Sequence, residues 1–241
     1  MSEELRPVIW ARLSKQGRGP ARTLSYERIT DAAIELADEG GLEAVSMRKI
    51  ATMLEHSAMS LYRHVGSKDD LTELMYDAAL GELELSRTGA EDWRVAVARL
   101  ARDNRRLWHR HPWISKLSQR PTLGPNANRM LEYALAAVDG IGLDMDQMWD
   151  VVATALQFTH GFVEEELAEA EVHRRTGMDI AAWQAHMAPF LRQLLEGGAR
   201  PYLRRFVTET EESPDQDVVF ERRLAMVLDG LAIMVASHQR T

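Results

Sequence analysis

The chain of 241 residues carries a net charge of −8, and 45 % of its residues are hydrophobic and 27 % charged. This composition is typical of globular proteins, and the length suits one large domain or two smaller ones. Because the sequence contains no cysteine, it excludes disulfide bonds and thiolate metal sites and fits a reducing compartment. The apolar run 230–237 is too short to span a bilayer, and the N-terminal segment lacks the apolar core of a signal peptide. We therefore expect a cytoplasmic protein with no membrane partner.

The acidic net charge conceals two basic segments. Residues 6–25 carry five basic side chains and no acidic one, and residues 46–68 carry four basic side chains and one acidic one. Acidic residues gather instead in 164–171 and 209–217. A basic pole on an acidic body would direct a polyanion to one end of the molecule. Two short basic segments can equally be solvated surface, and charge alone does not decide between these interpretations.

The first quarter of the chain predicts a basic arm and four helices. In the arm, residues 1–24, the glycines and proline of 16–20 indicate an extended and mobile chain. The first helix repeats apolar residues at the amphipathic period and ends at Gly40 and Gly41. Serine N-caps predict where the four helices begin, at Ser25, Ser46, Ser57 and Ser67.

The rest of the chain shows helical spacing of apolar residues and no strand alternation. The expected helices span residues 92–110, 126–139, 144–173, 179–197, 200–208 and 215–238, with a short helix between 112 and 118 and a possible break near Pro189. The predicted fold class is all-α, with a three-helix, helix-turn-helix head followed by a larger helical domain.

The helix predicted over 58–64 has only about two turns, so it must be held by its neighbours. Its apolar line consists of Ala58, Leu61 and Val65. The side chains that point away from this line, or lie at its flanks, are Met59, Ser60, Tyr62, Arg63 and His64. Hydroxyl, guanidinium, phenol and imidazole groups on a protruding helix suit the major groove of DNA.

Residues 26–75 resemble the DNA-binding head of the tetracycline-repressor (TetR) family of bacterial regulators. The matching stretches are AAIELADEGGLEAVSMRKIATML and SLYRHVGSKDDL, followed by an apolar helix. The rest of the chain resembles the C-terminal domain of that family more weakly, at Trp93, His111 and residues 120–122.

The resemblance implies a homodimeric repressor that leaves its operator DNA when a small, largely apolar molecule enters the C-terminal domain. It divides the chain into a flexible basic arm (1–24), a DNA-binding domain (25–75) and a ligand-binding and dimerisation domain (76–241). The positions expected to contact DNA are Arg22, Ser46, Arg48, Ser57, Ala58, Met59, Ser60, Tyr62, Arg63, His64 and Lys68.

Some of these contacts leave alternatives open. Lys68, in the first turn of a helix, would join a positive helix terminus in holding a phosphate. Tyr62 can also pack as a core aromatic with its hydroxyl outward. Arg18 and Arg22 of the arm can enter a minor groove, or the arm can stay disordered on DNA.

Two positions depart from the family pattern. Glu55 stands in the helix-turn-helix turn, where the family usually has glycine. Lys116 stands where the tetracycline repressor has a histidine that coordinates the drug-bound metal. We therefore do not expect a metal–tetracycline complex as the effector.

The expected ligand site lies in the C-terminal domain. Asn104 interrupts an apolar stripe, and a buried amide needs a partner, which is a ligand or a backbone or water group. The helix 144–173 is apolar nearly all round between 151 and 163, so it is buried on two sides, with His160 as a core histidine or a ligand contact. Tryptophans and methionines can line an adaptable cavity or simply fill a core. The expected ligand-binding residues are Leu100, Asn104, Trp108, Trp113, Leu117, Arg120, Phe158, Thr159, His160, Phe162 and Trp183.

The last helix, 215–238, has an apolar face that either docks on its own domain or joins the helix 144–173 in a four-helix dimer interface. We favour a dimer because a single head offers little surface for specific DNA binding, whereas a two-fold dimer supplies two heads. The expected interface residues are Val152, Leu156, Val163, Phe220, Leu224, Val227, Leu228 and Leu231.

A helical-bundle enzyme is the main alternative. Metal-binding bundles use Glu-x-x-His pairs, and none of the eight histidines has a glutamate three residues before it. The sequence also lacks a glycine-rich phosphate loop, GxSxG and HExxH. We therefore expect no catalytic residue, no metal and no cofactor. An interaction module that does not bind DNA is the remaining alternative.

Overall fold

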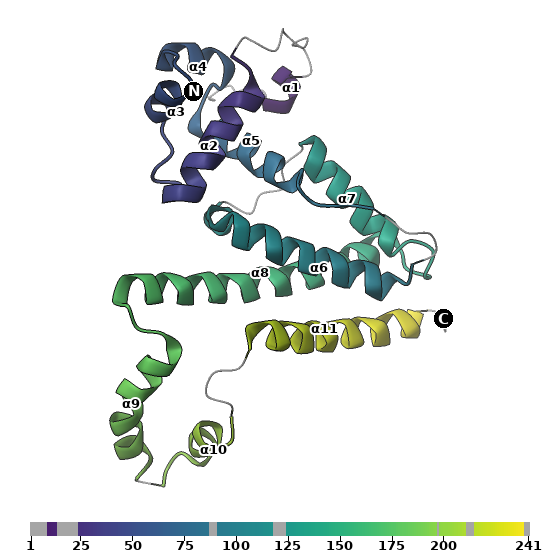
Figure 1. Cartoon of the computed structure of the whole chain (residues 1–241). Helices are drawn as coiled ribbons and strands as arrows, with labels where there is room; N and C mark the ends of the chain where they lie inside the picture. Colours follow the sequence, from purple (N-terminus) through teal and green to yellow (C-terminus); the bar gives the residue numbers. More distant parts are fainter. Residues whose placement is uncertain are drawn as a thin grey trace, which may run out of the picture.

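The computed structural model describes residues 9–13, 24–86, 91–117, 124–196, 198–210 and 215–238, and every regular element in these ranges is a helix (Figure 1). The head contains α1 (Ile9–Leu13), α2 (Tyr26–Gly40), α3 (Met47–Met53), α4 (Ala58–His64) and α5 (Lys68–Leu80). The body contains α6 (Trp93–Arg110), the 3-10 helix η1 (Pro112–Lys116), α7 (Pro125–Ala137), α8 (Met145–Thr176), α9 (Ile180–Leu195), α10 (Pro201–Glu209) and α11 (Gln216–His238). The all-α fold class is confirmed.

The predicted serine caps are present at the four helices for which they were expected, α2 to α5. The hydroxyl oxygen of each serine accepts a hydrogen bond from the backbone N–H three residues later, at distances from 3.0 Å for Ser67 to 3.4 Å for Ser25. Each bond satisfies one of the free N–H groups at a helix start and contributes about 1 kcal/mol. These helix starts are therefore determined by the local sequence.

The helix α5 joins the head to the body (Figure 1). Its first part packs against α2 through Leu71 and Met75, and its last residue, Leu80, lies in the same core as Trp113 and Ile114 of η1. One hydrophobic core therefore continues from the head into the body. The expected domain boundary at residue 75 falls inside this helix.

The short helix α1 differs from the expectation of a mobile arm. Ile9 is fully buried in the core, Trp10 Nε1 donates to Glu73 Oε1 at 2.6 Å, and Arg12 pairs with Asp70. Residues 9–13 are therefore packed onto α5. The basic residues Arg18 and Arg22 lie outside the described residues.

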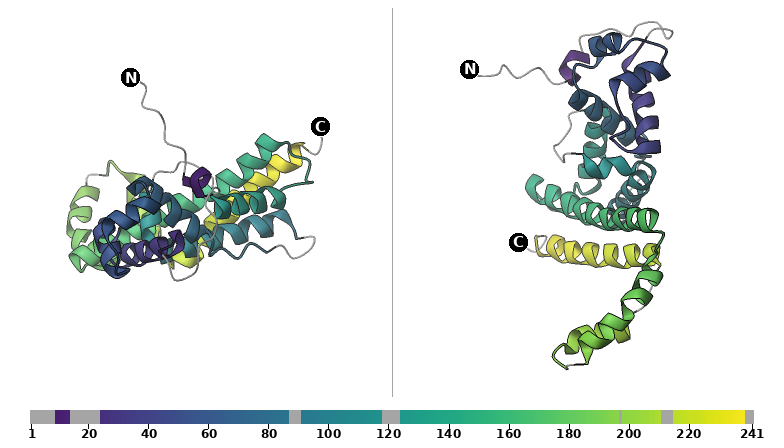
Figure 2. Two further views of the ribbon diagram at one scale, coloured as in Figure 1. Left: turned by 90° about the horizontal axis from the view of Figure 1, so that it is seen from above. Right: turned by 90° about the vertical axis from the view of Figure 1, so that its left-hand side faces the viewer.

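The body is built around α6 and α8, with α7 on one side and α11 on the other (Figures 1 and 2). Its second core joins residues of all four helices. By contrast, α9 and α10 extend away from the body, and neither helix has a buried residue. The helix α9 continues through Pro189 without the break considered for it. No helix in the described ranges has the length and apolar character needed to cross a membrane.

Candidate DNA-binding head and effector cavity

The helices α3 and α4 form the expected helix-turn-helix. Leu61 and Val65 are fully buried and hold α4 against the core of the head. Between the two helices, Glu55 has φ = 57°, in the left-handed region. This conformation explains why the family favours glycine there, and the structure shows that the turn forms with glutamate in its place.

The polar edge of α4 is exposed, as the sequence predicted. Met59 is 69 % and Tyr62 51 % exposed, and Arg63 is exposed beside them. His64 is half-buried with its ring edge-on to Tyr26 at 5.5 Å between centroids. This edge therefore presents aromatic, thioether and guanidinium groups on a protruding helix.

The remaining expected DNA contacts surround this edge or cap its helices. Arg48 of α3 and Lys68 in the first turn of α5 are exposed, and Ala58 and Ser60 are half-buried. The hydroxyls of Ser46 and Ser57 serve as N-caps, and Ser60 Oγ donates to Ser57 O at 2.6 Å. Arg22 lies outside the described residues. The contact roles of all these residues remain predictions.

Replacing Glu55 with glycine is expected to raise the free energy of unfolding by about 0.5–1 kcal/mol, because relief of the left-handed backbone exceeds the entropy that glycine adds to the unfolded chain. It should also tighten DNA binding by removing a carboxylate that lies between the two helices predicted to contact DNA. Denaturant unfolding and fluorescence anisotropy measure the two effects. Glu55→Ala is the matched control, which removes the charge but keeps Cβ. Equal stability of both variants would contradict the conformational explanation.

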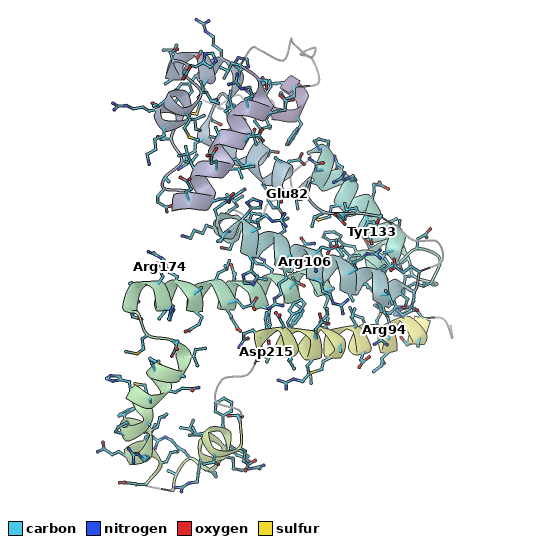
Figure 3. All side chains as sticks on the ribbon, viewed as in Figure 1. Glu82, Arg94, Arg106, Tyr133, Arg174 and Asp215 are labelled. Carbon is cyan, nitrogen blue, oxygen red and sulfur yellow. The ribbon has the colours of Figure 1, made fainter. Side chains whose placement is uncertain are left out.

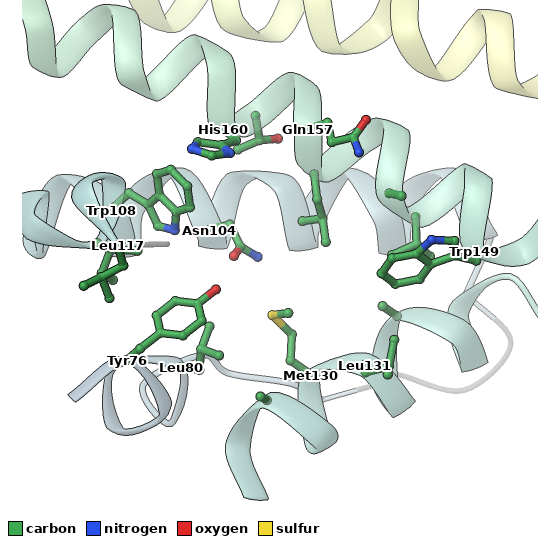
Figure 4. A pocket seen from close by; sticks show the side chains of 17 residues that line it. Tyr76, Leu80, Asn104, Trp108, Leu117, Met130, Leu131, Trp149, Gln157 and His160 are labelled. Carbon is green, nitrogen blue, oxygen red and sulfur yellow. The ribbon is translucent and has the colours of Figure 1, made fainter. Parts of the chain in front are cut away.

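A cavity of about 480 Å³ lies in the body between α5, α6, η1, α7 and α8 (Figure 4). Its aromatic wall consists of Tyr76, Trp108, Trp149 and His160, and its polar groups include Asn104, Gln157 and Thr159. Aliphatic and methionine side chains complete it, and no aspartate, glutamate, lysine or arginine is among the described residues that line it. The size and apolar character are those of a small-molecule site.

Two polar groups of the cavity wall are bonded to their own helix. Asn104 Nδ2 donates to Leu100 O at 2.9 Å, and Thr159 Oγ1 donates to Ala155 O at 2.9 Å. His160 Nε2 lies 3.3 Å from Glu164 Oε1, although the geometry is not that of a hydrogen bond. Trp108 Nε1 is buried and has no hydrogen-bond partner. Burial raises the pKa of the Tyr76 hydroxyl, so this group remains a hydrogen-bond donor.

The structure gathers part of the expected ligand site. Asn104, Trp108, Leu117, Thr159 and His160 line the cavity. Leu100 is instead buried in the second core, Phe158 and Phe162 pack against Phe220 of α11, and Trp183 lies on α9 with 52 % of its surface exposed. Trp113 contacts the head rather than the cavity, and Arg120 lies outside the described residues.

Several cavity residues have no counterpart among the expected ligand-binding residues. Tyr76 and Leu80 come from α5, Met130 and Leu131 from α7, and Trp149 and Gln157 from α8 (Figure 4). The positions of Tyr76 and Leu80 could have indicated their role, because both extend the apolar stripe of α5 beyond the head and towards the body. For α7, only the packing of the body reveals which face meets the cavity.

Most of the residues expected at the dimer interface are buried inside the protomer. Val152 and Leu156 line the cavity. Val163, Phe220, Leu224 and Leu228 are buried in the protomer's own cores, and Val227 and Leu231 are half-buried. A side chain already buried in one protomer has little surface left for a partner to cover. The alternative that α11 docks on its own domain is therefore the correct one for this face.

A polar cluster joins the head to the body. His111, which is buried, lies with Nδ1 2.7 Å from Asp38 Oδ1 of α2 and Nε2 3.0 Å from Glu82 Oε1. Trp113 Nε1 also donates to Asp38 Oδ1 at 2.7 Å, and Arg110 donates to Glu82. Figure 3 shows Glu82 where the head meets the body. We call Asp38, Glu82, Arg110, His111 and Trp113 the junction cluster.

The charges of the junction cluster support one another. The two ring nitrogens of His111 lie within hydrogen-bond distance of two different carboxylates, one from α2 and one from the segment after α5. Burial alone would raise the pKa of Glu82, but hydrogen bonds from Arg110 and His111 outweigh this effect and hold that pKa below its usual value. The cluster is therefore a set of charge-assisted bonds between two parts of the chain.

A helix-turn-helix head carried by a helical body with an internal cavity defines a ligand-responsive transcriptional regulator that binds DNA. Residues 29–75 match the family model of bacterial regulatory proteins of the tetR family, and residues 85–235 match that of the tetracyclin repressor-like C-terminal domain. The chain therefore belongs to the TetR family, as the sequence predicted.

Relatives and solved structures agree with this assignment. The HTH-type transcriptional repressor DrrR1 of Streptomyces coeruleorubidus is 34 % identical over 235 residues, which cover 96 % of this chain and 86 % of that protein. An HTH-type transcriptional regulator of Saccharopolyspora erythraea is 36 % identical over 166 residues, which cover 68 % of this chain and 70 % of that protein. The structure of ActR from Streptomyces coelicolor in complex with actinorhodin has a TM-score of 0.75 and 26 % identity, and the match covers 88 % of this chain and 99 % of that chain.

Proposed function

We propose that the protein is a homodimeric repressor that binds operator DNA through α3 and α4 and leaves it when a small molecule enters the cavity of the body. The observation that carries the proposal is the exposed edge of α4 together with the cavity of the body. The helix α5, which joins the head to the body, lines this cavity with Tyr76 and Leu80. The repressor relatives and the ActR complex with actinorhodin support both parts.

In this proposal the DNA contacts divide by chemistry. Ala58, Met59 and Ser60 lie at the start of α4 and would read base edges through apolar and hydroxyl contacts. Arg63, farther along the exposed face, supplies a donor fork for guanine or phosphate. Tyr62 and Lys68 would hold phosphates and thereby set the register of the head.

Replacing Tyr62 or Lys68 with alanine is expected to weaken operator binding about tenfold, because each removes a phosphate contact and neither side chain is buried. The thermal midpoint should change little. Fluorescence anisotropy with DNA from beside the coding gene measures the affinity, and Arg175→Ala, an exposed charge at the end of α8, is the control. Parental affinity in both variants would exclude this contact face.

The dimer is supported by apolar side chains that one protomer leaves uncovered. On α9 and α10 these are Trp183, Phe190, Tyr202 and Phe206, and on the outer face of α11 they are Val218, Met226 and Ile233. The helix α10 has nine residues and no buried side chain, so it needs a neighbour to be stable. Exposed apolar surface of this kind marks an interface, and we propose that a second copy covers it.

Replacing Ile233, which is 72 % exposed, with glutamate is expected to shift the protein from dimer to monomer at micromolar concentration. A charge at the centre of an apolar interface is desolvated without a partner. Light scattering coupled to size-exclusion chromatography measures the mass. Val95→Glu places the same charge at an exposed apolar position of α6 and should leave the dimer intact. A monomeric parent protein, or a dimeric Ile233→Glu variant, would argue against this interface.

Coupling between cavity and head is proposed to run through η1 and α5. In η1, Ile114 lines the cavity, as does Leu117 just after it, whereas Trp113 donates to Asp38 of the head. In α5, Tyr76 and Leu80 line the cavity while the preceding turns pack in the head. A ligand that fits one position of these elements better shifts the population of head orientations and so changes DNA affinity.

A further inference from the structure

The effector is expected to be uncharged, given the proposed function of the cavity. None of the described residues that line it is an aspartate, glutamate, lysine or arginine. A charge moved from water into such a site would lose its hydration and would meet no aspartate, glutamate, lysine or arginine among the described residues of the wall. Glu164, whose Oε1 lies 3.3 Å from His160 Nε2, is outside the wall, and half of its side chain is exposed to solvent.

The cavity wall favours flat aromatic molecules. Tyr76, Trp108, Trp149 and His160 contribute four rings from three helices (Figure 4). The rings of Trp108 and His160 already meet edge to face, with centroids 4.4 Å apart and an interplanar angle of 71°. Rings arranged at an angle to each other leave faces and edges for a further aromatic ring, and such contacts favour it over an aliphatic chain of equal area.

Two buried polar atoms of the wall, Trp108 Nε1 and His160 Nε2, lack a hydrogen-bond partner, and the indole N–H of Trp108 is the one that can only donate. Trp108 is 93 % buried, because only 7 % of its surface is exposed, and its Nε1 has no hydrogen-bond partner. Buried indole N–H groups normally have an acceptor, and an unpaired one carries a desolvation cost. Figure 4 shows the indole nitrogen of Trp108 facing the cavity near Asn104, with the Tyr76 hydroxyl directed to the same end.

We propose that the effector is an uncharged, planar aromatic molecule with an acceptor oxygen, such as a ring carbonyl, that receives the Trp108 Nε1 hydrogen and the Tyr76 hydroxyl hydrogen. Its rings extend from this polar end towards Met130 and the half-exposed Trp149. Filling the cavity in this way gives the buried indole N–H of Trp108 the acceptor that the described residues do not supply. The inference rests on the proposed effector role of the cavity, but it concerns binding and can be tested by itself.

Three probes with one ring system test the proposal: anthraquinone, anthracene and anthraquinone-2-sulfonate. Isothermal titration with the full-length protein should show anthraquinone binding at least about tenfold more tightly than either of the others. The carbonyl oxygens distinguish anthraquinone from anthracene, and the negative charge distinguishes it from the sulfonate. Equal affinity for anthraquinone and anthracene, or tighter binding of the sulfonate, would overturn the proposal.

The variant Trp108→Phe keeps an aromatic ring and removes only the N–H and the second ring. It should weaken anthraquinone binding about tenfold and anthracene binding much less. Tyr76→Phe removes a hydroxyl from an otherwise unchanged ring and should show the same selectivity, so the test does not depend on one variant folding. Trp93→Phe, at the start of α6 and outside the cavity lining, is the control. An equal loss for both probes in the two cavity variants would show that the donors play no part.

Operator release is a separate readout. If anthraquinone binds with the predicted selectivity but leaves operator affinity unchanged, the binding inference stands and the effector role of the cavity fails. If neither probe binds while the protein still binds its operator, the DNA-binding function stands and the inference fails.

Discussion

Replacing Asp38 with alanine is expected to lower the free energy of unfolding by about 2–4 kcal/mol and to weaken operator binding, although Asp38 lies outside the exposed edge of α4. Its Oδ1 lies 2.7 Å from His111 Nδ1 and accepts a hydrogen bond from Trp113 Nε1 at 2.7 Å. Removing it leaves the buried His111 Nδ1 and the Trp113 indole N–H without the carboxylate that they share.

The effect on DNA binding follows from orientation. In the parent protein the junction cluster fixes α2 against η1, so the head is held in one position relative to the body. Without Asp38 more head orientations become populated, and the apparent affinity falls in proportion to the fraction that remains competent. The change in affinity on adding an effector should shrink for the same reason, because η1, which lines the cavity through Ile114, no longer contacts the head through this carboxylate.

A double-mutant cycle distinguishes this role from general destabilisation. Asp38→Ala, His111→Phe and the double variant are compared by urea unfolding and by operator affinity. We expect the two losses to be non-additive by about 1–3 kcal/mol, as for residues in one network. Glu39→Ala, an exposed carboxylate next to Asp38 in sequence, is the matched control. If the losses of the two single variants are additive, or if fully folded Asp38→Ala binds the operator as tightly as the parent protein, the cluster does not position the head.

The local features of the head were predictable from sequence because their chemistry is local. A serine before an amphipathic run supplies the missing hydrogen-bond acceptor of a helix start, so Ser46 and Ser57 mark α3 and α4 without knowledge of the fold. The exposed edge of α4 follows from which of its residues are apolar. The same reasoning identified Asn104 and Trp108 in the cavity wall, because both interrupt or end the buried face of one helix.

The partners of a helix face were not predictable in the same way. The helix α11 is apolar on more than one face, and periodicity does not say which face meets the protomer's own α6 and α8. Phe220 was therefore assigned to a dimer interface, whereas it packs with Phe158 and Phe162 inside the protomer. The junction cluster was also not predictable from the sequence. Asp38 and His111 are 73 residues apart, and no pattern in the residues around either one indicates the other as its partner.

Replacing Asp77 with alanine is expected to lower the free energy of unfolding by about 2–4 kcal/mol. The carboxylate is buried in α5 and accepts hydrogen bonds from the backbone N–H groups of Asn126 and Ala127, at 3.1 and 2.9 Å, and from Asn126 Nδ2 at 3.1 Å. It therefore caps α7, whose N-cap residue, Gly124, has no side chain to do so. Burial raises the pKa of Asp77, although these hydrogen bonds oppose the effect.

Gly124 provides an independent test of the same contact. A Cβ placed there would lie 2.0 Å from Asp77 Oδ1 and 2.7 Å from Trp10 Cζ2, so Gly124→Ala displaces the capping carboxylate. If Asp77 stabilises the protein by capping α7, Gly124→Ala should lower the free energy of unfolding less in the Asp77→Ala variant than in the parent protein. The carboxylate that the new Cβ would displace is already absent from that variant.

Urea unfolding gives the stabilities, with Asp139→Ala, an exposed carboxylate just beyond α7, as the control. Asp77→Asn should lose only about 1 kcal/mol, since its carboxamide oxygen still accepts from the α7 backbone. Because α7 contributes Met130 and Leu131 to the cavity, the alanine variant should also bind anthraquinone more weakly than the asparagine variant. Equal stability of these two variants would mean that the charge, rather than the cap, determines the role of Asp77, and the start of α7 would then need another anchor.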